Sequence, residues 1–253
     1  MPERRPWTRD ELLLAFHLYC RTPFGRLHRN NPDIIELAAH IDRTPSAVAM
    51  KACNFASLDP VQQDRGISGL GNASRADREL WEEFFRESEA LASEMETAWE
   101  RMDVSVVDPP VLDMPKLGET DQLVLIRARR VQRFFRNVVM TAYESRCAIT
   151  GLAVPQLLEA GHIVPWSVDP ARRADPRNGI VLNSLHHRAF DRGLIGLDDS
   201  LQLMLSPALG SAESTEFQRA AFVHYEGQSI TLPTRFELDR EAVQYHREHI
   251  FVA

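Results

Sequence analysis

Side chains that can bind a metal ion or move a proton gather between residues 158 and 197. His187 and Asp191 are four positions apart in a segment with helical spacing, so both should leave the same face of a helix, one turn apart. An imidazole and a carboxylate together suit a hard or borderline divalent cation, and they leave coordination positions for water and phosphate. The spacing therefore predicts a metal site with two ligands on one helix.

His162 is the candidate for proton transfer. It follows a short apolar segment that predicts a strand, whose fixed backbone can direct the imidazole toward the metal. Imidazole is the side chain whose ordinary pKa best suits it to take a proton from water near neutral pH. Asn178 precedes Gly179 at a predicted turn, where its amide can bond to the backbone and lock the intervening loop. His186 points about 100° away from His187 around the helix, so we expect it to pack or to hydrogen-bond.

The order His162, Asn178, His187 resembles the motif of HNH endonucleases, whose fold is a two-stranded hairpin and a helix around one metal ion (ββα-metal). In that family the loop asparagine precedes the helix ligand by nine residues, and a second ligand often follows four residues later. Asn178, His187 and Asp191 have this spacing. The flanking stretches RCAITG, EAGHIVPW and NGIVLNSLHHRAFDRGL are similar to bacterial HNH restriction endonucleases, as is the leader WTRDELLLAFHLYC. The motif covers about residues 143–200, and the looser resemblance covers most of the chain.

The resemblance implies a role for each of these residues. His162 would be the general base that activates the attacking water, and Asn178 would hold the loop that orients it. His187 and Asp191 would hold one divalent metal ion, which polarises the scissile phosphate and stabilises the leaving 3′ oxygen. Mg²⁺ is our first expectation for this ion, with Mn²⁺, Ni²⁺ and Zn²⁺ as alternatives.

Gly161 is the one departure from the motif. Many HNH sites carry Asp or His directly before the base, as a metal ligand on the first strand. Either two protein ligands suffice here, or Glu159, two residues earlier, supplies the missing carboxylate. The paired cysteines that bind a structural zinc in many relatives are also absent, because Cys147 stands alone.

Capped apolar segments predict several helices in the first half of the chain. Thr8 to Glu11 fits a capping box, and Asn31-Pro32 and Thr44-Pro45 each offer a cap followed by proline at the first helical position. The short connection between the second and third helices suggests a helix-turn-helix unit that binds DNA. The groove residues would be Ser46, Lys51 and Asn54, and the phosphate contacts Arg26, His28, Arg29 and Arg43. A generic helical bundle that binds a protein explains the same pattern equally well.

Charge is distributed in blocks. The net charge of −7 comes from one acidic segment, since residues 77–121 contain fourteen Asp or Glu and four Lys or Arg. Ser74 begins a single long acidic helix that we expect to reach about Met102 and to face away from DNA. Residues 122–143 have five arginines and no acidic residue, which predicts a basic helix that follows a phosphate backbone.

Four arginines are the candidate nucleic-acid contacts. Arg130 and Arg133 lie in the basic helix, and Arg188 and Arg192 flank the predicted metal ligands. For the second pair, ordinary surface charge is an equal explanation.

The sequence predicts an α+β protein with two parts. A mainly helical N-terminal domain (1–106), a candidate for DNA binding or target selection, precedes a proline-rich linker (107–118) and an HNH nuclease domain (119–253). No apolar run is long enough to span a membrane, and the first residues lack the apolar core of a secretion signal. We therefore expect a cytoplasmic protein whose partner is DNA.

The function we predict is metal-dependent hydrolysis of DNA phosphodiester bonds, in restriction or phage defence. A non-specific effector nuclease activated by a partner protein is one alternative, and a catalytically inactive DNA-binding module is another. Because a single HNH site cuts one strand, cleavage of a duplex would need a homodimer or two successive nicks.

Overall fold

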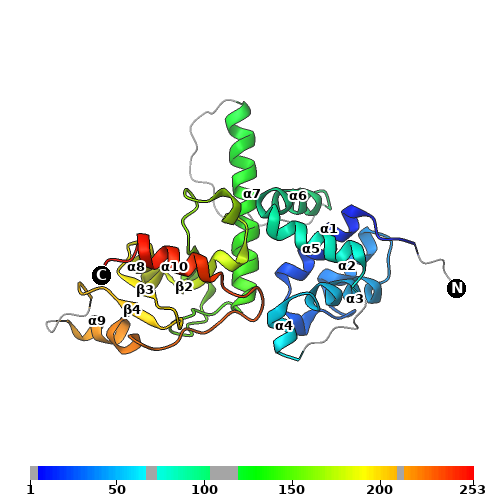
Figure 1. Cartoon of the computed structure of the whole chain (residues 1–253). Helices are drawn as coiled ribbons and strands as arrows, with labels where there is room; N and C mark the ends of the chain where they lie inside the picture. The colour runs from blue at the N-terminus through cyan, green and yellow to red at the C-terminus, as the bar shows by residue number, and fades with distance from the viewer. Residues whose placement is uncertain (1–4, 67–72, 103–118, 210–213) are drawn as a thin grey trace. The chain divides into compact units, whose positions relative to one another are not determined.

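The structure, a computed structural model, describes residues 5–66, 73–102, 119–209 and 214–253. The chain divides into two compact units, Met1–Asn137 and Val138–Ala253 (Figure 1). The predicted linker 107–118 lies outside the described residues. Helix α7 (Glu119–Ala142), which the sequence analysis assigned to the nuclease domain, contributes residues to both units.

The N-terminal unit is built from helices alone within its described residues. They are α1 (Arg9–Arg21), α2 (Pro32–His40), α3 (Pro45–Ala56), α4 (Pro60–Asp64), α5 (Arg75–Arg86), α6 (Ser88–Glu100) and the first part of α7, with a 3₁₀ turn at Phe24–Arg26. The caps have the expected chemistry: Thr8 and Glu11 form a capping box, and the side chains of Asn31 and Thr44 accept from backbone amides of α2 and α3. Local sequence therefore determines where these helices begin.

The long acidic helix expected between Ser74 and Met102 is two helices. The chain turns at Glu87, so α5 ends at Arg86 and α6 begins at Ser88. Both pack against α1, whose residues 11–20 are all buried. The turn allows two apolar faces to reach α1, and a straight helix of the same length would carry one of them away.

Helix α3 does not present the expected DNA-reading face. Lys51 is only 6% exposed, and its ammonium lies 2.7 Å from a carboxylate oxygen of Asp77, which is itself completely buried. Asn54 is buried as well, and of the three predicted groove residues only Ser46 is exposed. Arg43, a predicted phosphate contact, bonds to the Glu11 carboxylate at 2.7 Å. Lys51 and Asn54 therefore do not face a groove, because both belong to the interior of this unit.

The C-terminal unit contains a hairpin and a helix in the order that the sequence predicts. Strand β1 (Leu158–His162) pairs antiparallel with β2 (Gly179–Asn183), with His162 opposite Gly179, and α8 (Ser184–Asp191) follows β2 directly. Helix α8 packs against both strands. The α+β class is confirmed, since the structure is mainly helical with small antiparallel sheets.

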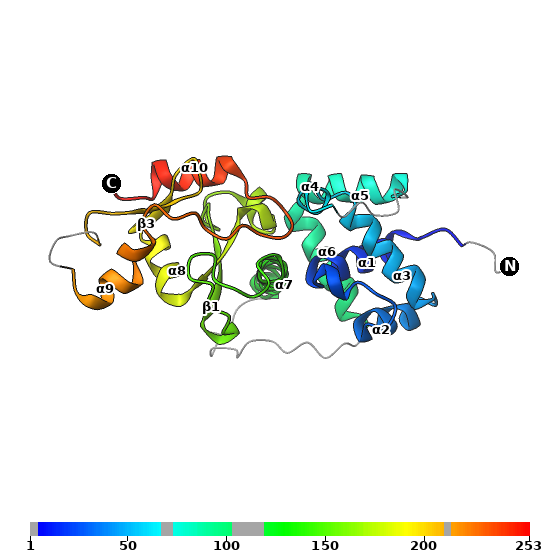
Figure 2. The ribbon, with the colours of Figure 1, turned by 90° about the horizontal axis from the view of Figure 1, so that it is seen from below.

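The remaining elements surround this ββα arrangement. They are the pair β3 (Ile195–Leu197) and β4 (Leu203–Leu205), the helices α9 (Glu216–Ala221) and α10 (Arg240–His249), and four 3₁₀ turns at Pro155–Leu157, Pro170–Arg172, Pro176–Asn178 and Val223–Tyr225. Helix α10, red in both views, packs beside β3 (Figures 1 and 2). Among the helices of the described residues, none is long and apolar enough to cross a membrane.

Candidate active site

The ring of His187 lies directly over Gly161. Helix α8 begins immediately after β2, with Asn183 as its cap, so the first turn of α8 is held close to the hairpin. A Cβ atom added to Gly161 would lie 2.7 Å from Cδ2 and 3.0 Å from Nε2 of His187. The glycine on β1 therefore provides the space that the imidazole on α8 occupies.

His162 is held as a neutral imidazole with a defined tautomer. Its Nε2 donates to the backbone oxygen of Arg173 at 2.9 Å, so in the neutral ring Nδ1 carries the lone pair. The indole of Trp166 packs edge-on against the ring, with 5.6 Å between the centroids. Burial lowers the pKa of His162, the bond to the Arg173 carbonyl opposes this, and the nearby imidazole of His187 adds a smaller lowering. The net shift favours the neutral form of the ring, in which Nδ1 can accept a proton.

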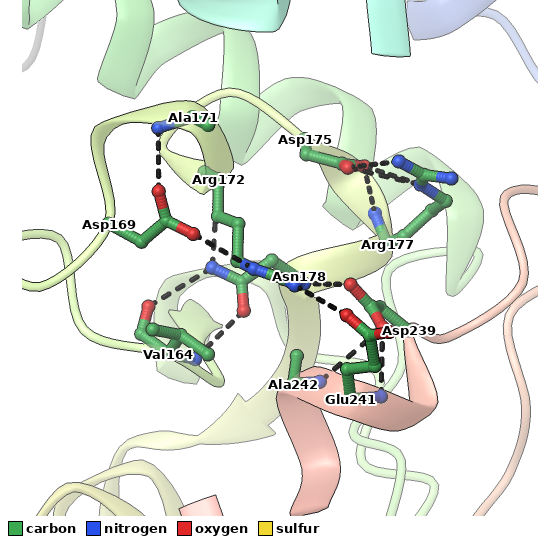
Figure 3. Close-up of polar contacts among 10 residues, drawn as sticks. All are labelled: Val164, Asp169, Ala171, Arg172, Asp175, Arg177, Asn178, Asp239, Glu241 and Ala242. Carbon is green, nitrogen blue, oxygen red and sulfur yellow. Dashed lines mark hydrogen bonds and ion pairs between the residues drawn. The ribbon is translucent and has the colours of Figure 1, made fainter. Parts of the chain in front are cut away.

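Asn178 joins both ends of the loop between β1 and β2 (Figure 3). Its Oδ1 accepts from the amide of Val164 at 2.8 Å, and its Nδ2 donates to the carbonyl oxygens of Val164 at 3.0 Å and Arg172 at 3.3 Å. The side chain is buried, so these bonds do not compete with water. Arg173, the next residue, has the carbonyl that accepts the hydrogen bond from Nε2 of His162. Asn178 therefore fixes the backbone that orients His162.

The segment that contains these residues matches a known family. Residues 147–198 match the model of the HNH endonuclease family. The match confirms the resemblance on which the sequence analysis relied, and it includes His162, Asn178, His187 and Asp191. A search of curated proteins gives no match to the chain. The HNH segment indicates nuclease chemistry on nucleic acids, and nucleases of this family generally use a divalent metal ion.

The HNH segment offers two donors for such an ion. Nδ1 of His187 lies 3.7 Å from Oδ2 of Asp191, and the two side chains are 26% and 47% exposed. Among the described residues, no group of three or more His, Cys, Asp or Glu is close enough to hold a metal, and Glu159 is not part of such a group. Mg²⁺ keeps several water molecules and takes one or two protein carboxylates. The donor set therefore fits a hydrated cation with open positions.

His186 has no place in this donor set. Its Nε2 donates to the carbonyl oxygen of Ala221 at 2.7 Å, and its Nδ1 accepts from Asn183 at 3.0 Å. As expected, His186 is a packing and hydrogen-bonding residue, which joins α8 to the end of α9.

The four candidate arginines fall into two kinds. Arg188 and Arg192 are exposed on the segment that carries the metal donors. Arg130 and Arg133 instead pair with carboxylates of α6: Arg130 lies 2.6 Å from Glu100, Arg133 lies 2.8 Å from Glu96, and Arg133 also bonds to Glu100. This differs from our expectation that they follow a phosphate backbone, because their guanidinium groups already bind carboxylates within the N-terminal unit.

Trp166 and Arg173 are the neighbours of His162 that sequence reasoning missed. The guanidinium of Arg173 lies over the Trp166 ring, 5.0 Å from its centroid, and its Nε donates to the Trp166 carbonyl at 2.9 Å. Both residues therefore constrain the loop that holds His162. The available signal was a tryptophan four residues after the candidate base, which a solvated loop would rarely carry.

Proposed function

We propose that this chain is a metal-dependent DNA endonuclease whose catalytic site lies in the C-terminal unit. One observation supports this most directly. His162 directly follows Gly161, over which the ring of His187 lies, and both histidines belong to a segment that matches HNH endonucleases. A base beside a metal donor is the arrangement that hydrolysis of a phosphodiester requires.

The chain's own residues perform the proton transfer in this proposal. Nδ1 of His162 takes a proton from the attacking water, and the bond from Nε2 to the Arg173 carbonyl keeps the ring oriented and stabilises the imidazolium that forms. Asn178 donates to the preceding carbonyl, that of Arg172, and so keeps this stretch of backbone in place. A divalent cation held by His187 and Asp191, with Mg²⁺ as the first candidate, would stabilise charge on the phosphate and on the leaving 3′ oxygen. The products would carry 5′-phosphate and 3′-hydroxyl ends.

Phosphate contacts are proposed for the exposed arginines of the HNH segment. Arg188 and Arg192 are solvent-accessible, so a nucleic-acid backbone can reach their guanidinium groups. Arg130 and Arg133 would first have to exchange their carboxylate partners for phosphate. We therefore expect truncation of Arg188 or Arg192 to weaken DNA binding and to reduce its dependence on salt.

Plasmid cleavage with and without EDTA tests the proposal. The native protein should nick supercoiled DNA in the presence of Mg²⁺ or Mn²⁺, and EDTA should abolish the cut. His162→Ala should lower the rate by about 100-fold or more, the range for loss of a general base. His249→Ala is the matched control, because it removes an exposed histidine of the same unit. If His162→Ala cuts as fast as the native protein, the assignment of the base is wrong.

Restriction or phage defence is the biological role we propose, on the basis of the resemblance to bacterial HNH restriction endonucleases. A restriction enzyme would give discrete bands, whereas a non-specific effector nuclease would give a smear. One such site cuts one strand, so duplex cleavage implies a homodimer or successive nicks. Sedimentation with and without DNA distinguishes the homodimer from a monomer that makes successive nicks. Only the homodimer predicts that two copies of the protein sediment together.

A further inference from the structure

Helix α10 lies outside the segment that matches the family, yet its first turn is bonded to the catalytic loop (Figure 3). Asp239 caps this helix: its Oδ1 accepts from the amides of Glu241 at 2.9 Å and Ala242 at 3.4 Å. Its other oxygen accepts from the guanidinium of Arg172, 67 residues earlier in the chain. Arg172 also bonds to Asp169 at 3.0 Å and to Glu241 at 3.1 Å. Three carboxylates thus hold one arginine of the loop.

The backbone of Arg172 connects these carboxylate contacts to the residues that orient His162. Its carbonyl oxygen accepts from Asn178, and the next carbonyl, that of Arg173, accepts from His162. A second tether runs from the amide of Asp239 to the carbonyl of Arg177, at 2.9 Å. The start of α10 therefore holds the loop at two points, on either side of the carbonyl that orients His162.

The end of α10 supports the other half of the site. Nε2 of His246 donates to the carbonyl of Phe190 at 3.0 Å, and the two rings stack with 3.7 Å between their centroids. Phe190 precedes Asp191 on α8. The chain beyond α10 returns to the same place, because the amide of Val252 donates to the carbonyl of Gly193 at 2.9 Å. One helix is thus bonded both to the loop of the base and to the helix of the metal donors.

We propose that α10 positions the general base, and that Arg172 and Asp239 are positioning residues of the endonuclease site. This inference rests on the proposed function. The Arg172 side chain is 23% exposed and that of Asp239 19%, so their charge-assisted bond is partly shielded from water and holds a fixed geometry. Loosening this bond frees the backbone of residues 172 and 173, and His162 then loses its fixed acceptor.

Asp239→Asn is the sharpest variant. Asparagine caps helices as well as aspartate does, so α10 keeps its start while the charge facing Arg172 is lost. We expect kcat to fall by about 10- to 100-fold, the range for partners that orient a catalytic group, with KM unchanged. Asp199→Asn is the matched control. It removes a carboxylate 2.6 Å from Arg247 of the same helix, but Asp199 is 92% exposed and its bonds to α10 go to Arg240 and Arg247 rather than to Arg172. It should leave kcat unchanged.

A second readout does not need the metal or any cleavage. The imidazole proton on Nε2 of His162 is bonded to a backbone carbonyl, so it should give a protected NMR signal that is absent in His162→Ala. We expect this signal in the metal-free native protein and in Asp199→Asn, and its loss in Asp239→Asn. Arg172→Lys keeps the positive charge but cannot reach three carboxylates. It should therefore lower kcat, but by less than Asp239→Asn does. Arg172→Gln combined with Asp239→Asn should be no worse than either alone.

The outcomes separate this inference from the proposed function. If Asp239→Asn keeps both the native kcat and the His162 signal, α10 does not position the base. A raised KM with unchanged kcat would overturn the inference too, because the tether would then serve substrate binding. If the native protein does not cut DNA with any divalent metal ion, the proposed function fails, and the NMR comparison still decides whether the tether holds His162.

Discussion

Adding one methyl group at Gly161 should lower the rate of DNA cleavage strongly while changing the free energy of unfolding little. In Gly161→Ala the new Cβ would stand 2.7 Å from Cδ2 and 3.0 Å from Nε2 of His187, whereas ordinary contacts begin near 3.4 Å. The ring must therefore move by several tenths of an ångström to about 1 Å. It lies at the end of a partly exposed side chain and can turn toward solvent.

The free energy of unfolding should change little in this variant. Gly161 lies in an extended strand with no positive φ, so alanine fits its backbone and restricts the unfolded chain. We expect a change within about 1 kcal/mol. The catalytic effect should be much larger, since a displacement of about 1 Å at a catalytic site costs on the order of 100-fold in rate. Weaker metal binding should accompany it, because His187 is one of the two donors that we propose for the ion.

Three measurements test this prediction: thermal unfolding, the rate of plasmid nicking, and calorimetric titration with Mn²⁺. Gly196→Ala is the matched control, because its Cβ would meet the ring of Phe251 at 2.9 Å, a similar overlap away from the site. Native rates and native Mn²⁺ affinity in Gly161→Ala would refute the reasoning. Gly161→Asp gives a second test. We expect it to lose activity because it displaces His187, so tighter metal binding there would show that the added carboxylate acts as a ligand.

Three further changes test other contacts. Asn178→Ala should abolish cleavage and lower the free energy of unfolding by about 3 kcal/mol, measured with denaturant, because it leaves the amide and carbonyl of Val164 buried without these bonds. Burial lowers the pKa of His246 to about 4, so the unfolded chain binds the extra proton between about pH 6.5 and 4. The free energy of unfolding should therefore decrease as the pH is lowered from about 6.5 to 4, by up to about 3 kcal/mol. His246→Gln should make the free energy of unfolding less dependent on pH in this window. Lys51→Met should destabilise the N-terminal unit by about 3–5 kcal/mol, because Asp77 then stays buried and unpaired; a loss of DNA affinity without destabilisation would instead support the helix-turn-helix interpretation.

The ββα arrangement was predictable because its signals are local. The strand that ends at His162, the turn at Asn178 and the capped helix with His187 all lie within about forty residues, and each depends on its immediate neighbours. The closeness of His162 to His187 follows from this short connection. The short connection does not predict that the ring of His187 fills the space beside Gly161, since this depends on the distance between a helix and a strand. Spacing in the sequence does not specify that distance.

Contacts between distant segments account for what the sequence did not predict. A lysine on a short helix is ordinarily a surface residue. Lys51 is buried because it pairs with Asp77, 26 positions later in the chain. Asp239 is recognisable as a helix cap, but its bond to Arg172 crosses 67 residues. His246 and His249 are three positions apart on one helix, so spacing alone does not distinguish them; His249 is exposed, while His246 is buried against Phe190. In each case the partner belongs to another element, and periodicity describes only one element at a time.

The charge blocks are the clearest example of this limit. Acidic and basic helices suggested two separate surfaces, one facing away from DNA and one toward it, because each block was considered by itself. In the N-terminal unit Arg127, Arg130 and Arg133 of α7 instead lie within 4.0 Å of Glu89, Glu96 or Glu100 of α6. Burial would raise the pKa of Glu100, but its bonds to two arginines outweigh this and keep the pKa low, so the pairs stay charged at neutral pH. A phosphate backbone must compete with these carboxylates for the same guanidinium groups. Electrostatic attraction of DNA should therefore depend more on Arg188 and Arg192 than on the three paired arginines of α7.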